Sequence, residues 1–578
     1  MPLFSLHSEN SVGIGEFVDL KLLVDWCRKT GNSIIQLLPL NEVGALFCPY
    51  DSVSSFALEP AYLSLRLLPG AVKKSLKAQI ENVKKAFACG KAHVDYCVKD
   101  EKLRLLRDIY FEEGAKDSAD FKNFREEHAY WLKDFTLFKV LKKHYQCLPW
   151  YEWDHKYQYR EPQALEVFLK EHILEINFEM WVQWACFRQL KAVKEYAGEN
   201  SILLEGDLPI LVSRDSADAW AHPEFFKLEF AAGAPADMYC AKGQRWGMPT
   251  YNWQKIQEDG YRYLKEKLKY AENFYDILRI DHVVGLFRIW SIPYNEPLDN
   301  QGLNGFFDPQ DEGRWEAGGR NILSLILENT KMLICAEDLG LIPYCCTKTL
   351  AELGIPGNDI QRWIKDWQVK HDFLGPENYR LLSVAMLSTH DTTNWPAWWE
   401  NEAGTIDRDL FIRKCVERGI DYHSVKWRLF DFNLSKHNRL RWLKEIISVD
   451  LLTEILGRRK EELTDFSDIY LNSYMEKEKL WSRLGLKGPM QEKATKELAA
   501  AILKSALEAR SIFSIQLLQD WMSLTDIFKG DPYQYRINMP GVISQNNWSL
   551  AIPISLENLL KHQICKEIKE MILVSGRA

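Results

Sequence analysis

No stretch of this 578-residue chain approaches the about 20 consecutive apolar residues that a membrane-spanning helix needs. The first residues, Met1–Glu9, lack the basic start and the apolar core of a signal peptide. Cysteines are sparse, at 12, and no pair has the spacing of a zinc site or a redox motif. We expect Cys27, Cys186 and Cys335, which lie in apolar runs, to be buried free thiols. These absences predict a cytoplasmic protein without a membrane partner.

The sequence also gives no sign of a basic surface. The net charge is -8, and no dense run of Lys and Arg contradicts that balance, so we expect no nucleic-acid partner. The chain has no Pro/Ser/Gly-rich linker, no low-complexity tract and no internal repeat. We therefore predict one continuous domain over residues 1–578.

What the chain does have is a set of short apolar runs that stop at a carboxylate. Four such runs end at Asp207, at Asp281, at Glu337 with Asp338, and at Asp391. Runs of this length, rich in Ile, Leu and Val, are typical of strands that are buried on both faces. Acids at strand ends, with helical patterns between the strands, predict an α/β fold of the (β/α)8 TIM barrel type with its site at the C-terminal rim.

Eight candidate strands can be counted, the number that a closed barrel needs. They are Leu3–Leu6, Ser33–Leu40, the three runs ending at Asp207, Asp281 and Glu337, Asp359–Trp363, the run ending at Asp391, and Ser511–Leu518. Long helical patterns separate the second strand from the third and the seventh from the eighth. We predict that these are helical insertions on the barrel, at about residues 63–198 and 400–508.

Several acids at one rim indicate glycosidic chemistry, because a retaining mechanism needs two carboxyl groups about 5–5.5 Å apart. Arg279 precedes Asp281 by two residues, so both side chains should lie on the same face of a strand. Such a pair would keep the aspartate ionised, as a nucleophile requires. A barrel salt bridge without a catalytic role explains this pattern equally well.

Three further features allow more than one interpretation. Neighbouring strand residues face opposite sides, so only one of Glu337 and Asp338 should enter the site, and the other is free to cap the following turn. His390 is either a hydrogen-bonded core residue or a ligand of a sugar hydroxyl. The segment Gly233–Trp253 is either a surface connection or a lid whose Trp246 stacks on a sugar.

The chain resembles the 4-α-glucanotransferases of the amylomaltase and disproportionating-enzyme family, glycoside hydrolase family 77. Its motifs are most similar to those of the plant-type cytosolic disproportionating enzymes. The matching segments occur in the family's order along the chain. They are Ser11–Leu20, Gln36–Leu40, Pro49–Tyr50 with Ser52–Phe56, Gly206–Ile210, Gly233–Pro235 through Gly243–Gly247, Arg279–His282, Ala336–Gly340, Thr389–Asp391 and Arg536–Gly541.

The resemblance implies roles for the acids. Asp281 would be the nucleophile, Glu337 the acid/base and Asp391 the stabiliser of the transition state. It also implies a set of substrate-binding residues, with Tyr50 expected on the outer surface or the acceptor side. This set is Arg279, His390, Asp207, Trp246, His282 and Tyr50.

The implied activity moves α-1,4-glucan segments from a donor maltooligosaccharide to the 4-hydroxyl of an acceptor, through a covalent glucosyl-enzyme. The expected partners are maltooligosaccharides or an α-glucan. No metal and no cofactor is expected, because carboxylates carry every proton transfer.

Three alternatives remain open at this point. One is an amylase-type hydrolase with the same acids, and the second is a glucan-binding protein whose site has decayed. The third is an unrelated barrel enzyme that acts on a phosphorylated substrate. Such an enzyme should carry Gly-rich phosphate-binding loops after strands seven and eight. The segments that follow these strands here, Asp391–Trp395 and Gln519–Met522, are not Gly-rich.

Overall fold

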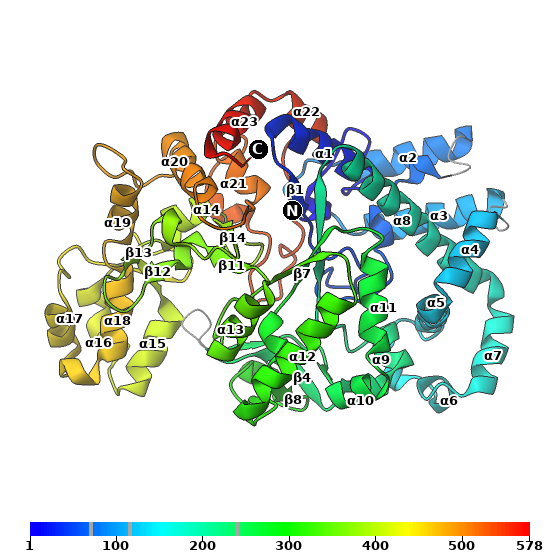
Figure 1. The fold of residues 1–578 in the computed structure, drawn as a ribbon, viewed down its shortest axis with the longest axis horizontal. Helices are drawn as coiled ribbons and strands as arrows, with labels where there is room; N and C mark the ends of the chain where they lie inside the picture. Colours follow the sequence, from blue (N-terminus) through cyan, green and yellow to red (C-terminus); the bar gives the residue numbers. More distant parts are fainter. Residues whose placement is uncertain (69–72, 114–117, 237–241, 578) are drawn as a thin grey trace.

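Two parallel sheets occupy the middle of the molecule in the computed structural model, which describes residues 1–68, 73–113, 118–236 and 242–577 (Figure 1). The first sheet has the order β1-β2-β7-β10, and the second has the order β11-β14-β18. Their bounds are Ile34–Gln36 for β1, Leu203–Leu208 for β2, Ile277–Ile280 for β7, Leu333–Ala336 for β10, Gly357–Ile360 for β11, Ser383–Met386 for β14 and Phe513–Ser514 for β18. Every residue of β7, β11 and β14 is buried, as expected for strands covered on both faces.

The prediction of a closed eight-stranded barrel is not met by the strands of the described residues. Seven of the eight predicted strands have a counterpart, and they form two separate ladders of four and three strands. Leu3–Leu6 was wrong as a strand, because Leu3–Ser5 forms a 3-10 turn in which the Leu6 N–H donates to the Leu3 carbonyl at 3.0 Å. Between the sheets, the Ala336 N–H donates to the Pro356 carbonyl at 2.8 Å and connects β10 to the approach of β11.

Several of the other predicted strands are shortened, and the sixth and the eighth give way to a turn or a helix. The strand expected at Asp359–Trp363 ends at Ile360, and Gln361–Trp363 forms a 3-10 turn. The strand expected at Ser511–Leu518 is reduced to Phe513–Ser514, because helix α21 (Leu518–Met522) begins at its far end. Apolar runs of this length do not mark where a strand gives way to a turn or a helix.

Helices surround these sheets. α1–α8 span the first third of the chain, as Asp19–Thr30, Lys74–Ala86, Val98–Glu113, Ala119–Glu127, Ala129–His144, His155–Gln158, Pro162–Glu171 and Ile173–Glu199. α9–α13 follow, as Ala217–Ala221, Trp253–Glu258, Arg262–Ala271, Trp315–Glu328 and Tyr344–Leu353. α14–α20 lie between β14 and β18, as Trp395–Ala397, Arg408–Glu417, Tyr422–Leu429, Val449–Leu456, Thr464–Ser473, Glu476–Arg483 and Lys496–Leu507. α22 (Leu556–Lys561) and α23 (Ile564–Ser575) close the chain and pack on α1.

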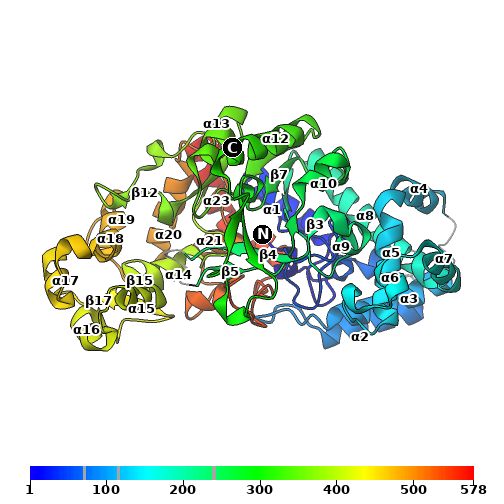
Figure 2. The same cartoon turned by 90° about the horizontal axis from the view of Figure 1, so that it is seen from below.

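The segments between β1 and β2 and between β14 and β18 extend to opposite sides of the molecule (Figures 1 and 2). The second segment was expected to be helical, but it also contains an antiparallel sheet of β15 (Thr405–Asp407), β17 (Arg439–Trp442) and β16 (Phe430–Asp431). This sheet, which we call the satellite sheet, and α15–α18 enclose a core of their own, which we call the satellite core. Its buried side chains run from Ile406 to Tyr470 and include Phe411 and Phe466.

The segment Gly233–Trp253 is more structured than an open connection. Its start belongs to β4 (Phe230–Ala234), which pairs with β5 (Gln244–Arg245) and β8 (Ile289–Pro293), and β9 (Phe306–Asp308) completes this antiparallel sheet. Figure 2 shows β4 and β5 near the middle of the molecule. Residues 237–241, at the centre of the expected lid, lie outside the described residues.

Short two-stranded pairings complete the fold. β3 (Phe226–Lys227) pairs with β6 (Thr250–Tyr251), and β12 (Lys365–Asp366) pairs with β13 (Asp372–Phe373). Among the described helices, none combines the length and the apolar character that crossing a bilayer would require. The expected thiols are confirmed, because Cys27, Cys186 and Cys335 are buried and free.

Candidate active site

The register of the first sheet brings a cation between two carboxylates. Asp207 on β2 is paired with Arg279 on β7, and Asp281 follows β7 directly. The Arg279 Nη1 atom donates to both Asp207 oxygens at 2.7 Å and to Asp281 Oδ1 at 2.9 Å. The side chains of Arg279 and Asp207 are 8% and 1% exposed, whereas that of Asp281 is 25% exposed. Asp281 is therefore the member of this network that a substrate can reach.

Glu337 lies beside Asp281 at the end of β10. Its Oε2 accepts from the His282 backbone N–H at 2.8 Å, and its Oε1 accepts from the Leu339 N–H at 3.0 Å. Burial raises the pKa of Glu337 to about 8, with Arg279 opposing the rise and the charge of Asp281 adding to it. Glu337 is thus held mainly protonated at neutral pH, next to an aspartate that is bonded to a cation.

Asp338 has a different environment from Glu337. Its oxygens accept from the Asn358 N–H at 2.7 Å and from Arg380 Nη1 at 2.6 Å. Only Glu337 of the two neighbours therefore joins the Arg279 network, and Asp338 links β10 to the second sheet. The cap on the following turn comes from Glu337, through the Leu339 N–H.

Asp391 reaches the rim from the loop that follows β14. Its Oδ1 accepts from Asn538 Nδ2 at 2.7 Å, its Oδ2 lies 3.3 Å from His390 Nε2, and its carbonyl accepts from Arg536 Nη2 at 3.0 Å. Partial burial would raise the pKa of Asp391, but His390, Asn538 and Arg279 outweigh it and lower that pKa to about 2. This carboxylate, 49% exposed, is ionised across the working pH range.

Tyr50 joins Asp207 to this loop. Its hydroxyl donates to Asp207 Oδ2 at 2.7 Å, and its ring stacks on His390 with centroids 5.2 Å apart. The ring of Trp548 lies within 6 Å of both, at 5.9 Å from Tyr50 and 5.8 Å from His390. Of the two positions expected for Tyr50, the outer surface is wrong, because the hydrogen bond places the residue within the acid cluster, and the acceptor side stays a prediction.

His282 and Trp246 form a further wall beside the acids. The two rings meet edge to face, with centroids 4.7 Å apart. His282 has a left-handed backbone (φ 46°), which is rare outside glycine and directs its N–H to Glu337. Burial lowers the pKa of His282 to about 4, so its imidazole is neutral at pH 7. Trp246 is anchored beside β5, where its backbone N–H donates to the Ala232 carbonyl at 2.9 Å.

These contacts connect all nine residues that the sequence singled out, and they add three that it did not assign. Asn538, Arg536 and Trp548 contact Asp391, His390 or Tyr50. The first two lie in the segment Arg536–Gly541, for which the sequence indicates a match to the family but no role. Nothing in its composition indicates that it returns to a loop about 147 residues earlier in the chain.

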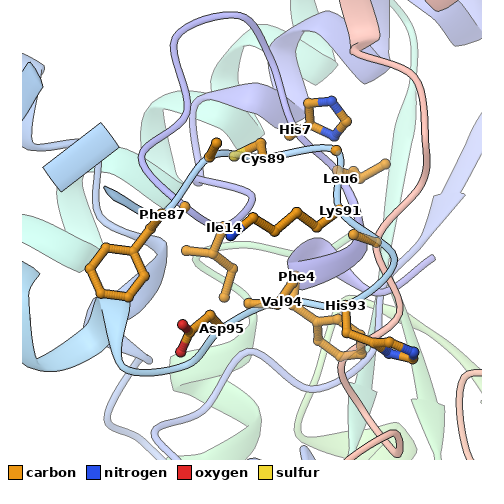
Figure 3. Close-up of a pocket in the computed structure, with 14 residues that line it drawn as sticks. Phe4, Leu6, His7, Ile14, Phe87, Cys89, Lys91, His93, Val94 and Asp95 are labelled. Carbon is orange, nitrogen blue, oxygen red and sulfur yellow. The ribbon is translucent and has the colours of Figure 1, made fainter. Parts of the chain in front are cut away.

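A small cavity lies elsewhere in the molecule and includes none of these residues (Figure 3). Its volume is about 20 Å³, close to the space for one water molecule and far below that of a sugar ring. Phe4, Ile14, Phe87 and Val94 give it a mostly apolar wall. It is a packing gap between the N-terminal segment and the segment after α2.

Comparisons with known proteins point to one family. The family model described as 4-alpha-glucanotransferase matches residues 1–555. A 4-alpha-glucanotransferase of Chlamydia caviae is 34% identical over 97% of this chain and 91% of its own length. The rice (Oryza sativa) 4-alpha-glucanotransferase DPE2 is 25% identical over all of this chain and 69% of its own length. The structure of an amylomaltase from Streptococcus agalactiae in complex with acarbose superposes with a TM-score of 0.73, at 23% identity, over 100% of this chain and 98% of that one.

Proposed function

The chain belongs to the 4-alpha-glucanotransferase family, and from that premise we propose that it transfers α-1,4-glucan segments by a retaining double displacement at Asp281 and Glu337. The observation that carries the proposal is the contrast between the two acids. Asp281 is bonded to Arg279, while Glu337, bonded to the neighbouring amide, has a pKa near 8. A retaining enzyme needs a carboxylate nucleophile and, beside it, an acid that holds a proton at neutral pH, which is the property that Glu337 has.

In the first step Asp281 attacks the anomeric carbon of the donor, and Glu337 protonates the glycosidic oxygen that leaves. The bond to Asp281 forms as the bond to the leaving sugar breaks, so the configuration inverts once. Arg279 donates to Asp281 Oδ1 at 2.9 Å and so orients the carboxylate for the attack. Asp391 binds hydroxyls of the reacting sugar, and its permanent charge suits the positive character of the transition state.

In the second step the acceptor's 4-hydroxyl displaces Asp281 while Glu337 takes the proton. The electrostatics support this change of role. The charge of Asp281 is one cause of the high pKa of Glu337, and that charge disappears when the ester forms. Glu337 then loses its proton more readily and acts as the base, and the α configuration is restored.

The remaining predicted residues have supporting roles in this proposal. Tyr50, Asp207 and His390 form one wall of the donor-sugar site, and Trp246 with His282 forms another. The substrates are neutral maltooligosaccharides or an α-glucan. We also infer that the two parallel sheets are the parts of a (β/α)8 barrel, in keeping with their joint at Ala336 and Pro356.

Incubation with maltotriose, followed by sizing of the products, tests this function. We expect glucose together with longer maltooligosaccharides from the wild type, and neither from Asp281→Asn, because an amide is not a nucleophile here. Glu337→Gln should form an adduct with an α-glucosyl fluoride, whose leaving group needs no protonation, and mass spectrometry should locate that adduct on Asp281.

An amylase-type hydrolase would instead release glucose and maltose without longer products. Binding of maltotriose by calorimetry with no turnover would indicate a glucan-binding protein. Normal product ladders from Asp281→Asn would refute the assignment of the nucleophile, whichever activity is present.

A further inference from the structure

The loop Ser388–Thr393 carries His390 and Asp391 at its tip, and its two ends are deeply buried. Ser388 and Thr393 are 0% and 1% exposed, while Asp391 projects into the open rim. We propose that Arg362, a residue with no assigned part in the reaction, is a positioning residue that fixes the place of Asp391 by clamping both ends of this loop. The inference rests on the role of Asp391 in the proposed function.

The clamp consists of four hydrogen bonds from one guanidinium. On the near side of the loop, Arg362 Nη2 donates to the Leu387 carbonyl at 3.3 Å and to Ser388 Oγ at 3.0 Å. On the far side, Nη2 donates to the Thr393 carbonyl at 2.9 Å, and Nη1 donates to Thr393 Oγ1 at 3.0 Å. The segments that enter and leave the loop are therefore tied to the same rigid, planar group.

The position of Arg362 in the fold suits this role. It follows β11, the neighbour of β14 in the second sheet, so it reaches the loop from the adjacent strand end. It is 3% exposed, and its guanidinium lies over the ring of Trp398, 5.5 Å from the centroid. A buried arginine is costly to desolvate, and it is retained here by bonds to the loop and by Glu402 at 3.8 Å.

Glu402 reinforces the far end of the clamp. The Thr393 hydroxyl donates to Glu402 Oε1 at 3.0 Å while it accepts from Arg362, so it has a partner on each side. At the tip, the loop is closed by the Thr389 N–H, which donates to Thr392 Oγ1 at 2.9 Å. Arg362 thus holds the two ends of the loop, and Asn538 and Arg536 hold Asp391 at its tip.

None of the Arg362 contacts reaches Asp281, Glu337 or Asp391 directly. Its effect on the reaction must pass through the loop. A displacement of about 1 Å at a catalytic group can cost on the order of 100-fold in rate. Loss of the clamp should therefore lower kcat more than it weakens the binding of the donor, to which several other residues contribute.

Arg362→Lys tests the clamp, because lysine keeps the charge and cannot span both ends of the loop. In maltotriose disproportionation we expect kcat to fall about 10- to 100-fold, with KM within about 3-fold of the wild type. Arg439→Lys is the matched control, because Arg439 also donates to the hydroxyl and the carbonyl of one threonine, Thr405, at 3.0 Å each, but on the satellite sheet. That variant should keep both constants within about 3-fold.

Two further measurements keep the proposal falsifiable if Arg362→Lys does not fold. Thr393→Val removes the hydroxyl between Arg362 and Glu402, and we expect it to lower kcat about 3- to 10-fold. Thr393→Ser restores that hydroxyl and should restore most of the rate. Equal kcat values for the valine and serine variants would overturn the clamp.

A double-mutant cycle separates this inference from the proposed function. If Arg362 acts through Asp391, Arg362→Lys should change the residual rate of Asp391→Asn by less than about 2-fold. A loss of the full single-mutant size in that background would overturn the clamp alone. Wild-type activity in Asp391→Asn itself would overturn the proposed role of Asp391, and with it the function on which the inference rests.

Discussion

Glu337 should make the protein less stable at alkaline pH, and removing its carboxyl should reverse that effect. Its folded-state pKa is about 8, against an ordinary value of 4.5. A carboxyl whose pKa is raised by folding costs nothing below its unfolded-state pKa. Its cost grows as pH rises from about 4.5 and is complete above about 8. That interval corresponds to about 5 kcal/mol of unfolding free energy.

Glu337→Gln removes this titration but carries a constant cost of its own. The carboxylate accepts from two backbone N–H groups, those of His282 and Leu339, and an amide has only one oxygen to offer them. The unsatisfied N–H should cost about 1–3 kcal/mol at every pH. We therefore expect the variant to be less stable than the wild type near pH 5 and more stable near pH 9.

The assay is urea unfolding followed by tryptophan fluorescence, with the free-energy difference between variant and wild type measured at pH 5, 7 and 9. The constant cost cancels when these differences are compared, so only the titration of Glu337 remains. Glu166→Gln is the control, because the bond to Lys170 lowers the pKa of the exposed Glu166, so this carboxyl is ionised in both states above pH 5 and its difference from the wild type should stay nearly constant from pH 5 to 9. A Glu337→Gln difference that is constant to about 0.5 kcal/mol from pH 5 to 9 would refute the protonated acid.

Three other substitutions probe the same site. Arg279→Met should lower the unfolding free energy, measured in urea, by about 3–5 kcal/mol, because it leaves Asp207 buried without its cation. Adding Asp207→Asn should recover part of the stability and none of the activity. Full stability in the single variant would contradict the cost assigned to the unpaired Asp207. Trp246→Ala should raise the KM for maltotriose about 10-fold with a smaller change in kcat, because the ring packs against His282 as a wall of the site and takes no part in proton transfer. An unchanged KM would contradict a place for Trp246 in the substrate-binding site. Asp391 has a lowered pKa, so its stabilising effect is complete above its ordinary value of 3.8 and is lost as pH falls toward about 2. The loss of melting temperature caused by Asp391→Asn should therefore shrink from pH 6 to pH 3. A loss that grows instead would refute the assigned ionisation.

The acids could be found from the sequence because their signal is local. A carboxylate that interrupts a buried apolar run marks the end of a strand, and parallel strands end at one edge. The spacing of Arg279 and Asp281 likewise predicted their shared face, and the bond at 2.9 Å follows from it. The catalytic roles of Asp281, Glu337 and Asp391 stay predictions until the variants are measured.

Other features depend on contacts that no local pattern encodes. Leu3–Leu6 has the composition of a strand but closes a turn, because an apolar tetrapeptide does not specify its own backbone bonds. Asn538 reaches Asp391 only after the chain has passed through the whole second segment. The strands of the satellite sheet are two to four residues long and lie among helices, so their alternation is too brief to detect.

The satellite core shares no buried side chain with the main core in the part of the chain that the structure describes. A change of volume at Phe411 or Phe466 should therefore be absorbed where it occurs. Its contacts with the rest of the molecule include the stacking of His437 on Tyr533, at 3.7 Å, and the contact of His437 Nε2 with Asp531 Oδ2 at 3.1 Å. Exchanging this module between relatives, with those bridging side chains kept, is thus a route to altering the outer shape of the enzyme while sparing its chemistry.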